Sequence, residues 1–259
     1  MLDEIVMTKQ QEIEQAKKER PFEDLKAQLA RHLTERGFRQ AIHVPGKLSL
    51  IAELKRKSPS RGMLRERFDP VQLAQTMEKA GAAALSVLTD EAYFGGHLDF
   101  LRDAKAFTEI PVLRKDFVVD PYQVYEAAFY QADAILLIVR ILTEEVLSEC
   151  LQAADRLGLE ALVEVHSETD LKTALNVGAH TIGINHRDLA TFQLDATLAE
   201  QLVPKIPAGK VIVAESGLQT PADIQRMKRL GVHAVLIGEA LMTAPDPAVK
   251  IRELFTSVW

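Results

Sequence analysis

Eight short apolar segments, rich in β-branched residues, recur along the chain at nearly even spacing. Amphipathic stretches of helical length separate them, such as PVQLAQTMEKAG (70–81) and PADIQRMKRLG (221–231). Strands that alternate with helices form a parallel sheet with right-handed crossovers. Eight such units favour a closed α/β barrel, the (β/α)8 TIM barrel. The predicted strands are residues 48–54, 83–89, 111–114, 134–139, 161–165, 181–185, 211–216 and 234–239.

A doubly wound open sheet is the alternative to the barrel. Such a sheet usually has a glycine-rich turn for a nucleotide after its first strand, and no G-x-G-x-x-G follows any apolar segment. Four junctions repeat one layout of helix end, glycine and strand, as in KAGAAALSVLT (79–89) and RLGLEALVEV (156–165). The glycine supplies the left-handed conformation that ends a helix. The junction before residues 134–139 has Gln131 at this place, which leaves its turn unexplained.

The first 47 residues are predicted to form a helical extension of a barrel over 48–255, and no linker divides the 259 residues into separate domains. Asp3 is expected to cap a first helix that ends before Pro21. A second helix is indicated by Phe22, Leu25, Leu29 and Leu33, with Gly37 as its stop. We expect the extension to pack on the barrel as a cap; a lid or an oligomer contact is the alternative.

Composition excludes several classes of function. The net charge of −6 argues against a nucleic-acid partner, although a local basic pocket for a small anion is compatible with it. The single cysteine, Cys150, rules out an intrachain disulfide and a thiolate metal cluster, and it favours a reducing, cytoplasmic location. The N-terminus lacks the apolar core of a signal peptide, and residues 134–139 are too short to span a membrane. The seven histidines show no metal-binding spacing, so we do not expect a metal site.

Charged and polar side chains lie at the ends of the predicted strands, where barrels place their functional groups. A carboxylate buried in an apolar strand costs several kcal/mol unless it is paired, and the neighbouring cations could pair with these carboxylates. One such charge would be read as a structural salt bridge, but their convergence on one barrel mouth predicts a catalytic site. The residues concerned are Glu53, Lys55, Lys115, Glu164, Asn185, Arg187 and Glu215.

Two motifs indicate a phosphate site. AESG (214–217) and IGEA (237–240) follow the last two predicted strands, where barrels commonly bind phosphate through backbone N–H groups. The alternative is that these glycines only turn the chain. The predicted phosphate ligands are Ser216, Gly217, Gly238 and Glu239, and the Glu239 side chain is expected to point away because a carboxylate repels phosphate. Ser58 either binds an anionic oxygen or caps a helix. Phe94, Phe117 and Leu136 form an apolar wall for a flat ring, or simply core.

These motifs, in order and spacing, resemble the indole-3-glycerol-phosphate synthase family along residues 1 to 255. The matching segments are IAELKRKSPSRG (51–62), LSVLTDEAYFGG (85–96), PVLRKDFVVDPYQ (111–123), DAILLIV (133–139), LVEVH (162–166), IGINHRDL (182–189), VAESGL (213–218) and AVLIGEALM (234–242). The chain departs from the commonest family pattern at His97, Gln131 and His186.

The resemblance implies a (β/α)8 barrel with an N-terminal helical extension. It implies a carboxy-lyase without a cofactor that closes the ring of 1-(2-carboxyphenylamino)-1-deoxyribulose 5-phosphate, an anionic substrate, in tryptophan synthesis. The products are indole-3-glycerol phosphate, carbon dioxide and water. By resemblance Lys115 is the general acid and Glu164 the general base of dehydration. Lys55 and Glu53 assist, and Asn185, Arg187 and Glu215 complete the polar site. Ser58, Ser216, Gly217, Gly238 and the residue after it take the anionic groups.

The pKa of Lys115 matters for its role as an acid. A second cation nearby would lower that pKa toward neutrality, and Arg114 and Lys55 are candidates, whereas Glu53 and Asp116 would oppose them. The sequence leaves this balance open. Two rival functions are a sugar-phosphate isomerase, with Glu53 as its base, and a binding barrel without chemistry. The chain is expected to be a monomer or a homodimer.

Overall fold

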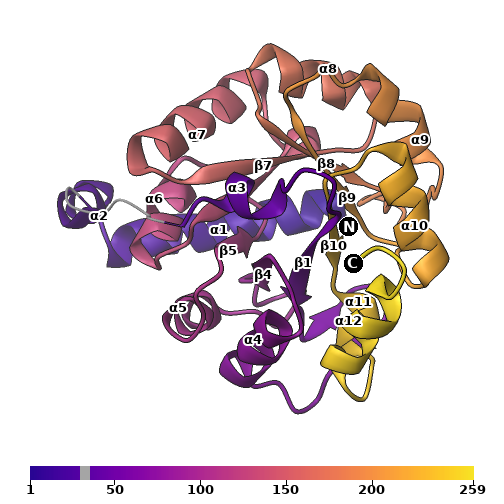
Figure 1. The fold of residues 1–259 in the computed structure, drawn as a ribbon. Helices are drawn as coiled ribbons and strands as arrows, with labels where there is room; N and C mark the ends of the chain where they lie inside the picture. Colours follow the sequence, from indigo (N-terminus) through magenta and orange to yellow (C-terminus); the bar gives the residue numbers. More distant parts are fainter. Residues whose placement is uncertain (30–35) are drawn as a thin grey trace.

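Eight parallel strands close into a ring in the computed structural model, which describes residues 1–29 and 36–259 (Figure 1). Each strand pairs with its neighbours in the chain, and β1 closes the ring by pairing with β10 on one side and β4 on the other. The barrel prediction is therefore confirmed, and the open sheet is excluded. The barrel strands are β1 (Ser49–Leu54), β4 (Ala84–Leu88), β5 (Val112–Lys115), β6 (Ala134–Ile138), β7 (Glu160–Val165), β8 (Thr181–Asn185), β9 (Val211–Glu215) and β10 (Ala234–Ile237).

Helices follow the strands and cover the outside of the ring (Figure 1). Their starts are encoded locally: Asp69 accepts a hydrogen bond from the N–H of Gln72, and Thr220 and Asp223 form a reciprocal capping box. His97 caps the helix that begins at Leu98, because its ring Nδ1 accepts a hydrogen bond from Asp99 N–H at 3.1 Å. The residue that departs from the commonest family pattern therefore still serves as a helix cap. The helices are α4 (Pro70–Lys79), α5 (Leu98–Ala106), α6 (Tyr122–Phe129), α7 (Glu144–Leu157), α8 (Glu168–Asn176), α9 (Leu198–Leu202), α10 (Pro221–Leu230), α11 (Glu239–Met242) and α12 (Pro247–Phe255), with short 3-10 turns at Val139–Ile141 and Val203–Lys205.

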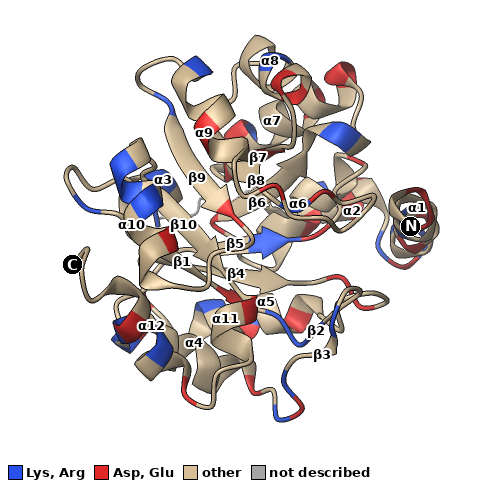
Figure 2. Ribbon diagram, turned by 90° about the vertical axis from the view of Figure 1, so that its right-hand side faces the viewer, with Lys and Arg blue, Asp and Glu red and all other residues tan. Residues whose placement is uncertain are grey.

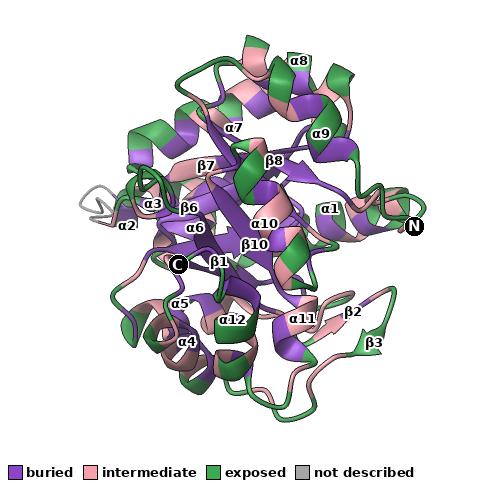
Figure 3. Ribbon diagram, turned by 45° about the vertical axis from the view of Figure 1, so that its right-hand side comes forward, coloured by how far each residue is buried: buried purple, intermediate pink, exposed green. Residues whose placement is uncertain are grey.

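Strand alternation divides the apolar residues into two layers. One set of side chains faces the helices, as Leu50 and Val163 do. The other set faces inward and fills the barrel interior, as Ile51, Leu113 and Leu162 do. The strands are buried almost throughout (Figure 3). Replacing one of these large side chains by alanine is expected to lower the free energy of unfolding by about 2–5 kcal/mol. Because apolar side chains fill the interior of the barrel, the pocket lies at the ends of the strands.

The N-terminal extension consists of α1 (Leu2–Glu19), α2 (Phe22–Leu29) and α3 (Phe38–Ile42). It packs on the barrel as expected: Ile5 and Phe38 join the interior cluster, and Lys9 is buried against Asp90 and Asp116. The expected break before Pro21 is confirmed. No helix of the described residues is long and apolar enough to cross a membrane.

Two details of the extension were predicted wrongly. Asp3 does not cap α1, because the helix begins two residues earlier than predicted, with Met1 at the cap position, and Asp3 lies in the first turn. Gly37 does not show the left-handed conformation of a helix stop: its φ is −66°, and it precedes α3 as the N-cap. Leu33, the last residue of the predicted second helix, lies outside the described residues.

The turn before β6 forms without a glycine. Gln131 takes a φ of 65°, as Gly81, Gly158, Gly178 and Gly231 do at the corresponding junctions. The hydrogen bonds are also the same: the N–H of Ala132 donates to Ala127 O at 2.9 Å, as that of Ala82 does to Met77 O at 3.0 Å. The fold therefore forces an L-residue into the left-handed region, which costs about 1–2 kcal/mol.

We expect Gln131→Gly to raise the free energy of unfolding by about 0.5–1 kcal/mol, because relief of the left-handed strain outweighs the extra entropy of glycine in the unfolded chain. Urea unfolding measures the change. Gly178→Gln is the matched reverse variant, since Gly178 has a φ of 84° and nothing lies within 4 Å of the position of a Cβ. This variant should lose a similar amount. A destabilised Gln131→Gly protein would contradict the explanation.

Candidate active site

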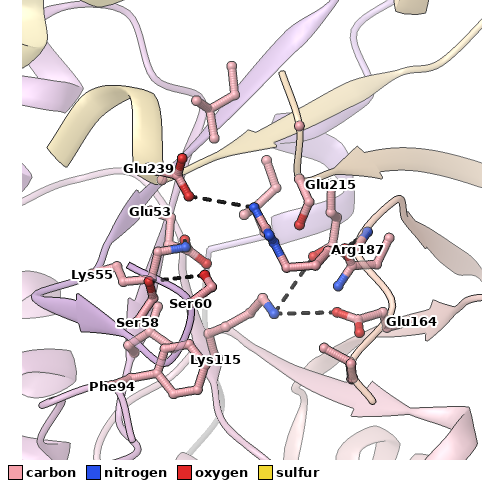
Figure 4. A pocket seen from close by; sticks show the side chains of 18 of the residues that line it. Glu53, Lys55, Ser58, Ser60, Phe94, Lys115, Glu164, Arg187, Glu215 and Glu239 are labelled. Atoms are coloured by element: carbon pink, nitrogen blue, oxygen red, sulfur yellow. Dashed lines mark hydrogen bonds and ion pairs between the residues drawn. The ribbon is translucent and has the colours of Figure 1, made fainter. Parts of the chain in front are cut away.

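All of the predicted site residues line one pocket at the C-terminal ends of the strands. Charged segments occur among the strands at this end of the barrel (Figure 2), and Figure 4 shows acidic and basic side chains converging on the cavity. The predicted residues that line it are Glu53, Lys55, Ser58, Phe94, Lys115, Phe117, Leu136, Glu164, Asn185, Arg187, Glu215, Ser216, Gly217, Gly238 and Glu239. Inward-facing positions of the strands and the loops after them supply this set.

Lys115 lies at the centre of the charged groups. Its Nζ is 3.3 Å from Glu164 Oε2 and 3.8 Å from Glu215 Oε2, as the dashed lines in Figure 4 mark. Burial disfavours the charge, but the carboxylates of Glu164, Glu215 and Glu53 outweigh burial and hold the pKa of Lys115 above its ordinary value. The structure thus settles the balance that the sequence left open: Lys115 is a charged ammonium group.

Arg114 is not among the main groups that shift the pKa of Lys115, because the two side chains leave β5 on opposite faces. Arg114 is buried outside the ring, where it donates to Thr89, to the carbonyl of Gln123 and to Glu126. Asp116 is likewise occupied, by Arg114 NH2 at 3.1 Å and by Lys9 Nζ at 3.0 Å. Burial opposes the Asp116 charge, but Lys9 and Arg114 hold its pKa below the usual range. These residues fix the end of β5 from behind, with help from α1.

Glu164 on β7 is fully buried, and each of its oxygens has a cationic or polar neighbour. Oε2 faces Lys115, and Oε1 lies 3.2 Å from His166 Nε2. Burial raises the pKa of this carboxyl, but Lys115 with His166 and Asn185 more than compensates, so the pKa lies well below its usual value. Glu164 is therefore an ionised carboxylate beside the ammonium group of Lys115.

Glu215 on β9 is the opposite case. Neither of its oxygens accepts a hydrogen bond from the described residues, and Lys115 is closer to Glu164 than to it. Burial, together with the charges of Glu164 and Glu53, raises the pKa of Glu215 to about 8. Lys55 is committed elsewhere, since its Nζ pairs with Glu53 Oε2 at 2.6 Å. Glu215 consequently keeps its proton at neutral pH, and the mouth contains a carboxylic acid beside a carboxylate.

Two glycines make room for these carboxylates. A Cβ at Gly183 on β8 would overlap Glu215 Oε1, and a Cβ at Gly238 would overlap Glu53 Oε2. From the sequence, Gly238 is predicted only as a phosphate ligand, and Gly183 has no predicted role. A glycine inside a strand often marks a close approach of another group, and this signal in TIGIN could have identified Gly183.

The loops after β9 and β10 differ from expectation in one respect. Ser216 and Gly217 are both left-handed, with φ of 65° and 73°. The Glu239 side chain is expected to point away from a bound phosphate, but its carboxylate lies at the pocket, 3.5 Å from Arg187 Nη2 and 3.0 Å from Arg61 Nη2 (Figure 4). Arg187 therefore pairs with Glu239 and not with a strand carboxylate. Arginine pairing allows a carboxylate at this position.

Apolar side chains line the same pocket beside the charged groups. The ring centroids of Phe94 and Phe117 lie 5.9 Å apart, and Leu136 lines the same cavity. Further residues line the cavity that were not predicted; of these, Ile138 and Leu236 lie two strand positions from predicted residues and could have been found by strand alternation. The missed apolar residues include Leu88, Ile138, Leu189, Phe192, Leu218, Leu236, Ile237 and Ala240. Within the described residues, no group of His, Cys, Asp and Glu is arranged to hold a metal ion.

Sequence comparisons point to one family. The family model of indole-3-glycerol phosphate synthase matches residues 2–254. A curated protein of that name from Carboxydothermus hydrogenoformans is 43% identical over 98% of both chains. Another, from Caldanaerobacter subterraneus subsp. tengcongensis, is 45% identical over 96% of both. A third, from Dehalococcoides mccartyi, is 52% identical over 79% of this chain and 80% of its own length.

Solved structures resemble the fold. A crystal structure of 3-hexulose-6-phosphate synthase superposes with a TM-score of 0.65 at 16% identity, over 82% of this chain and 100% of that one. The thiamine phosphate pyrophosphorylase from Pyrococcus furiosus gives a TM-score of 0.61 at 18% identity, over 82% and 96%. At these identities the likeness concerns the barrel alone.

The raised pKa of Glu215 predicts a pH dependence of stability. Between about pH 5 and 8 the native protein keeps a proton that the unfolded chain has released, so this group's contribution to the free energy of unfolding falls as pH rises, by at most about 1.4 kcal/mol per unit. Glu215→Gln removes the dependence. Urea unfolding should show the variant gaining stability relative to wild type from pH 5 to 8 and levelling off above 8.

Glu253→Gln, a substitution of an exposed carboxylate, is the control and should keep a constant difference from wild type across this range. A constant difference for Glu215→Gln as well would mean that Glu215 is already ionised at pH 5.

Proposed function

The chain belongs to the indole-3-glycerol phosphate synthase family, and we propose that Lys115 is the general acid of its reaction. The chain catalyses ring closure of 1-(2-carboxyphenylamino)-1-deoxyribulose 5-phosphate to indole-3-glycerol phosphate, with loss of carbon dioxide and water, in tryptophan biosynthesis. The observation that carries the assignment of the acid is the position of Lys115, a charged ammonium group at the centre of the barrel mouth. The isomerase and binding-barrel alternatives are set aside with the family assignment.

Ring closure requires a proton for the ribulose carbonyl oxygen as the carboxylate-bearing aromatic carbon attacks C2′. The raised pKa of Lys115 keeps the ammonium group charged until the substrate arrives. Transfer remains downhill, because the alkoxide that forms is far more basic than a lysine amine. Catalysis by a positioned acid of this kind contributes about 10²- to 10⁴-fold. Phe94, Phe117 and Leu136 would hold the aromatic ring against the apolar wall.

Decarboxylation follows attack, and the bonding electrons of the departing carbon dioxide restore the aromatic ring. The substrate carboxylate then loses its charge, so a site that leaves it poorly solvated favours the step. Lys55 and Ser58 lie on the first loop and can orient this carboxylate, provided that Lys55 exchanges its Glu53 partner.

Dehydration removes the C2′ hydroxyl and one proton from the neighbouring carbon or nitrogen. Glu164 takes this proton, since it is ionised and lies 3.3 Å from Lys115. The departing hydroxyl needs a second proton. Glu215 carries one up to about pH 8 and lies 3.8 Å from Lys115 Nζ, so it can return a proton to Lys115 or support the leaving group. Asn185 stabilises the Glu164 carboxylate, and Glu53 with Lys55 flanks the same space.

The substrate phosphate binds at the loops after β9 and β10. Backbone N–H groups of Ser216, Gly217, Gly238 and Glu239 would face the phosphate, and the left-handed turn at Ser216 and Gly217 makes a concave group of donors. Arg187 adds a positive charge at the rim.

Every residue assigned a role belongs to one chain, so the site is complete in a monomer and would also be complete in each half of a homodimer. We place the enzyme in the cytoplasm, because its one cysteine is a free, buried thiol and its pathway is biosynthetic. We also treat the barrel and its N-terminal extension as one domain.

Lys115→Ala should lower kcat by about 10³-fold or more while substrate still binds, because the acid is lost but the phosphate and ring sites remain. Indole fluorescence follows product formation, and calorimetry follows binding. Lys18→Ala, an exposed position in the last turn of α1, is the control and should leave the rate unchanged. A Lys115→Ala enzyme within tenfold of wild type would show that another group is the acid, and a folded wild type without product would overturn the activity.

Glu239→Gln should tighten inorganic phosphate binding by about three- to tenfold, because it removes a negative charge from the rim and frees Arg187. Competitive inhibition by phosphate and direct calorimetry measure this change. Glu253→Gln, which alters a carboxylate on the neighbouring α12, should have no effect. Weaker phosphate binding by Glu239→Gln would mean that the carboxylate supports the site by holding Arg61 and Arg187.

A further inference from the structure

One buried histidine at the barrel mouth has no part in the reaction described above. His186 follows β8, between Asn185 and Arg187, and only 2% of it is exposed. Its ring Nδ1 lies 2.9 Å from the carbonyl oxygen of Glu215 and 3.1 Å from that of Ser216. Carbonyl oxygens only accept hydrogen bonds, so Nδ1 must carry the hydrogen and donate to both.

The two carbonyls belong to a strained junction. Ser216 has a φ of 65°, a left-handed conformation that an L-residue keeps only when its surroundings enforce it. The junction joins the strand residue Glu215, whose carboxyl group lies beside Lys115, to the predicted phosphate-binding amides of Ser216 and Gly217. The backbone N–H of His186 also donates to Glu215 O, at 3.0 Å. His186 thus holds the end of β9 from its backbone and its side chain together.

We propose that His186 is a positioning residue, which through its Nδ1–H fixes the Glu215–Ser216 junction and so aims the Glu215 carboxyl group and the phosphate-facing amides. The proposal rests on the phosphate site of the proposed function. It differs from a packing role, because it requires a donor at one ring position and predicts a change in ligand binding as well as in stability.

The surroundings keep the ring neutral. Burial lowers the pKa of His186, although its two carbonyl partners oppose this effect. Two charged groups act on its pKa, Arg226 on α10, which lowers it, and Asp195 after β8, which raises it. Nε2 is buried without a hydrogen-bond partner among the described residues, so a second ring proton would have no acceptor. The neutral Nδ1–H form is therefore the form that binds the junction.

Asparagine offers a direct test, because its side-chain nitrogen is two bonds from Cβ, as Nδ1 of histidine is. We expect His186→Leu to weaken inorganic phosphate binding about tenfold and to lower kcat, whereas His186→Asn stays within threefold of wild type. Calorimetry with phosphate and steady-state turnover measure the two effects. Because glycine takes a positive φ without strain, Ser216→Gly added to His186→Leu should recover part of the phosphate affinity.

His233→Leu is the matched control. The His233 ring Nδ1 accepts from the N–H of Ile212 at 2.9 Å, at the other end of the same strand, so the variant should lose stability but bind phosphate normally. Equal phosphate binding by wild type and His186→Leu overturns the positioning role. A wild type that binds no phosphate overturns the phosphate site itself, and with it this inference.

One measurement needs no variant and so does not depend on the folding of His186→Leu. Nitrogen NMR of the wild-type imidazoles should show His186 as the Nδ1–H tautomer from pH 6 to 8. An Nε2–H tautomer would remove the proposed donor and would refute the inference.

Discussion

The active site depends on burying one ammonium group among carboxylates that outnumber it. Lys115 is within 4 Å of both Glu164 and Glu215, and Glu53 adds to the field around it. One cation cannot stabilise both neighbouring charges in a dry site. The proton therefore distributes unequally: Glu164 is ionised, and Glu215 holds its proton to about pH 8. Two similar side chains therefore differ in protonation, one being a carboxylate and the other a neutral carboxylic acid.

The barrel stabilises this buried charge cluster because the two faces of each strand have different functions. Outward-facing residues of β5 and β9 pack against helices, whereas the inward-facing residues fill the interior and end in Lys115 and Glu215 at the mouth. Arg114 and Lys115 illustrate the division. Arg114 is enclosed by Thr89, Gln123 and Glu126 and fixes the strand, whereas Lys115 enters the mouth. Lys9 of α1 strengthens the same support by pairing with Asp116. The N-terminal extension therefore helps to hold the strand that presents Lys115.

The sequence predicted the barrel and the pocket lining well, because both follow from local patterns repeated along the chain. A charged residue at the end of a predicted strand can be assigned to the pocket even when its ion-pair partners are unknown. Pairing could not be predicted in this way. Whether Arg187 meets Glu215 or Glu239 depends on side-chain directions in separate loops, and Gly183 gains its meaning only from Glu215 across the neighbouring strand. The turn at Gln131 could not be predicted for a different reason: the fold imposes a left-handed conformation there that the local sequence disfavours.

The charge balance of the mouth constrains how substrate binds. Lys55 is paired with Glu53, and Arg187 and Arg61 are paired with Glu239, so these cations are already occupied before an anion arrives. A substrate with a phosphate and a carboxylate must therefore exchange protein ion pairs for its own. Such an exchange yields less affinity than binding to unpaired cations, because the displaced carboxylates remain near the new anions. Backbone N–H groups carry no counter-ion, so at the proposed phosphate site we expect the turn at Ser216 and Gly217 to contribute more to phosphate affinity than the paired cations do.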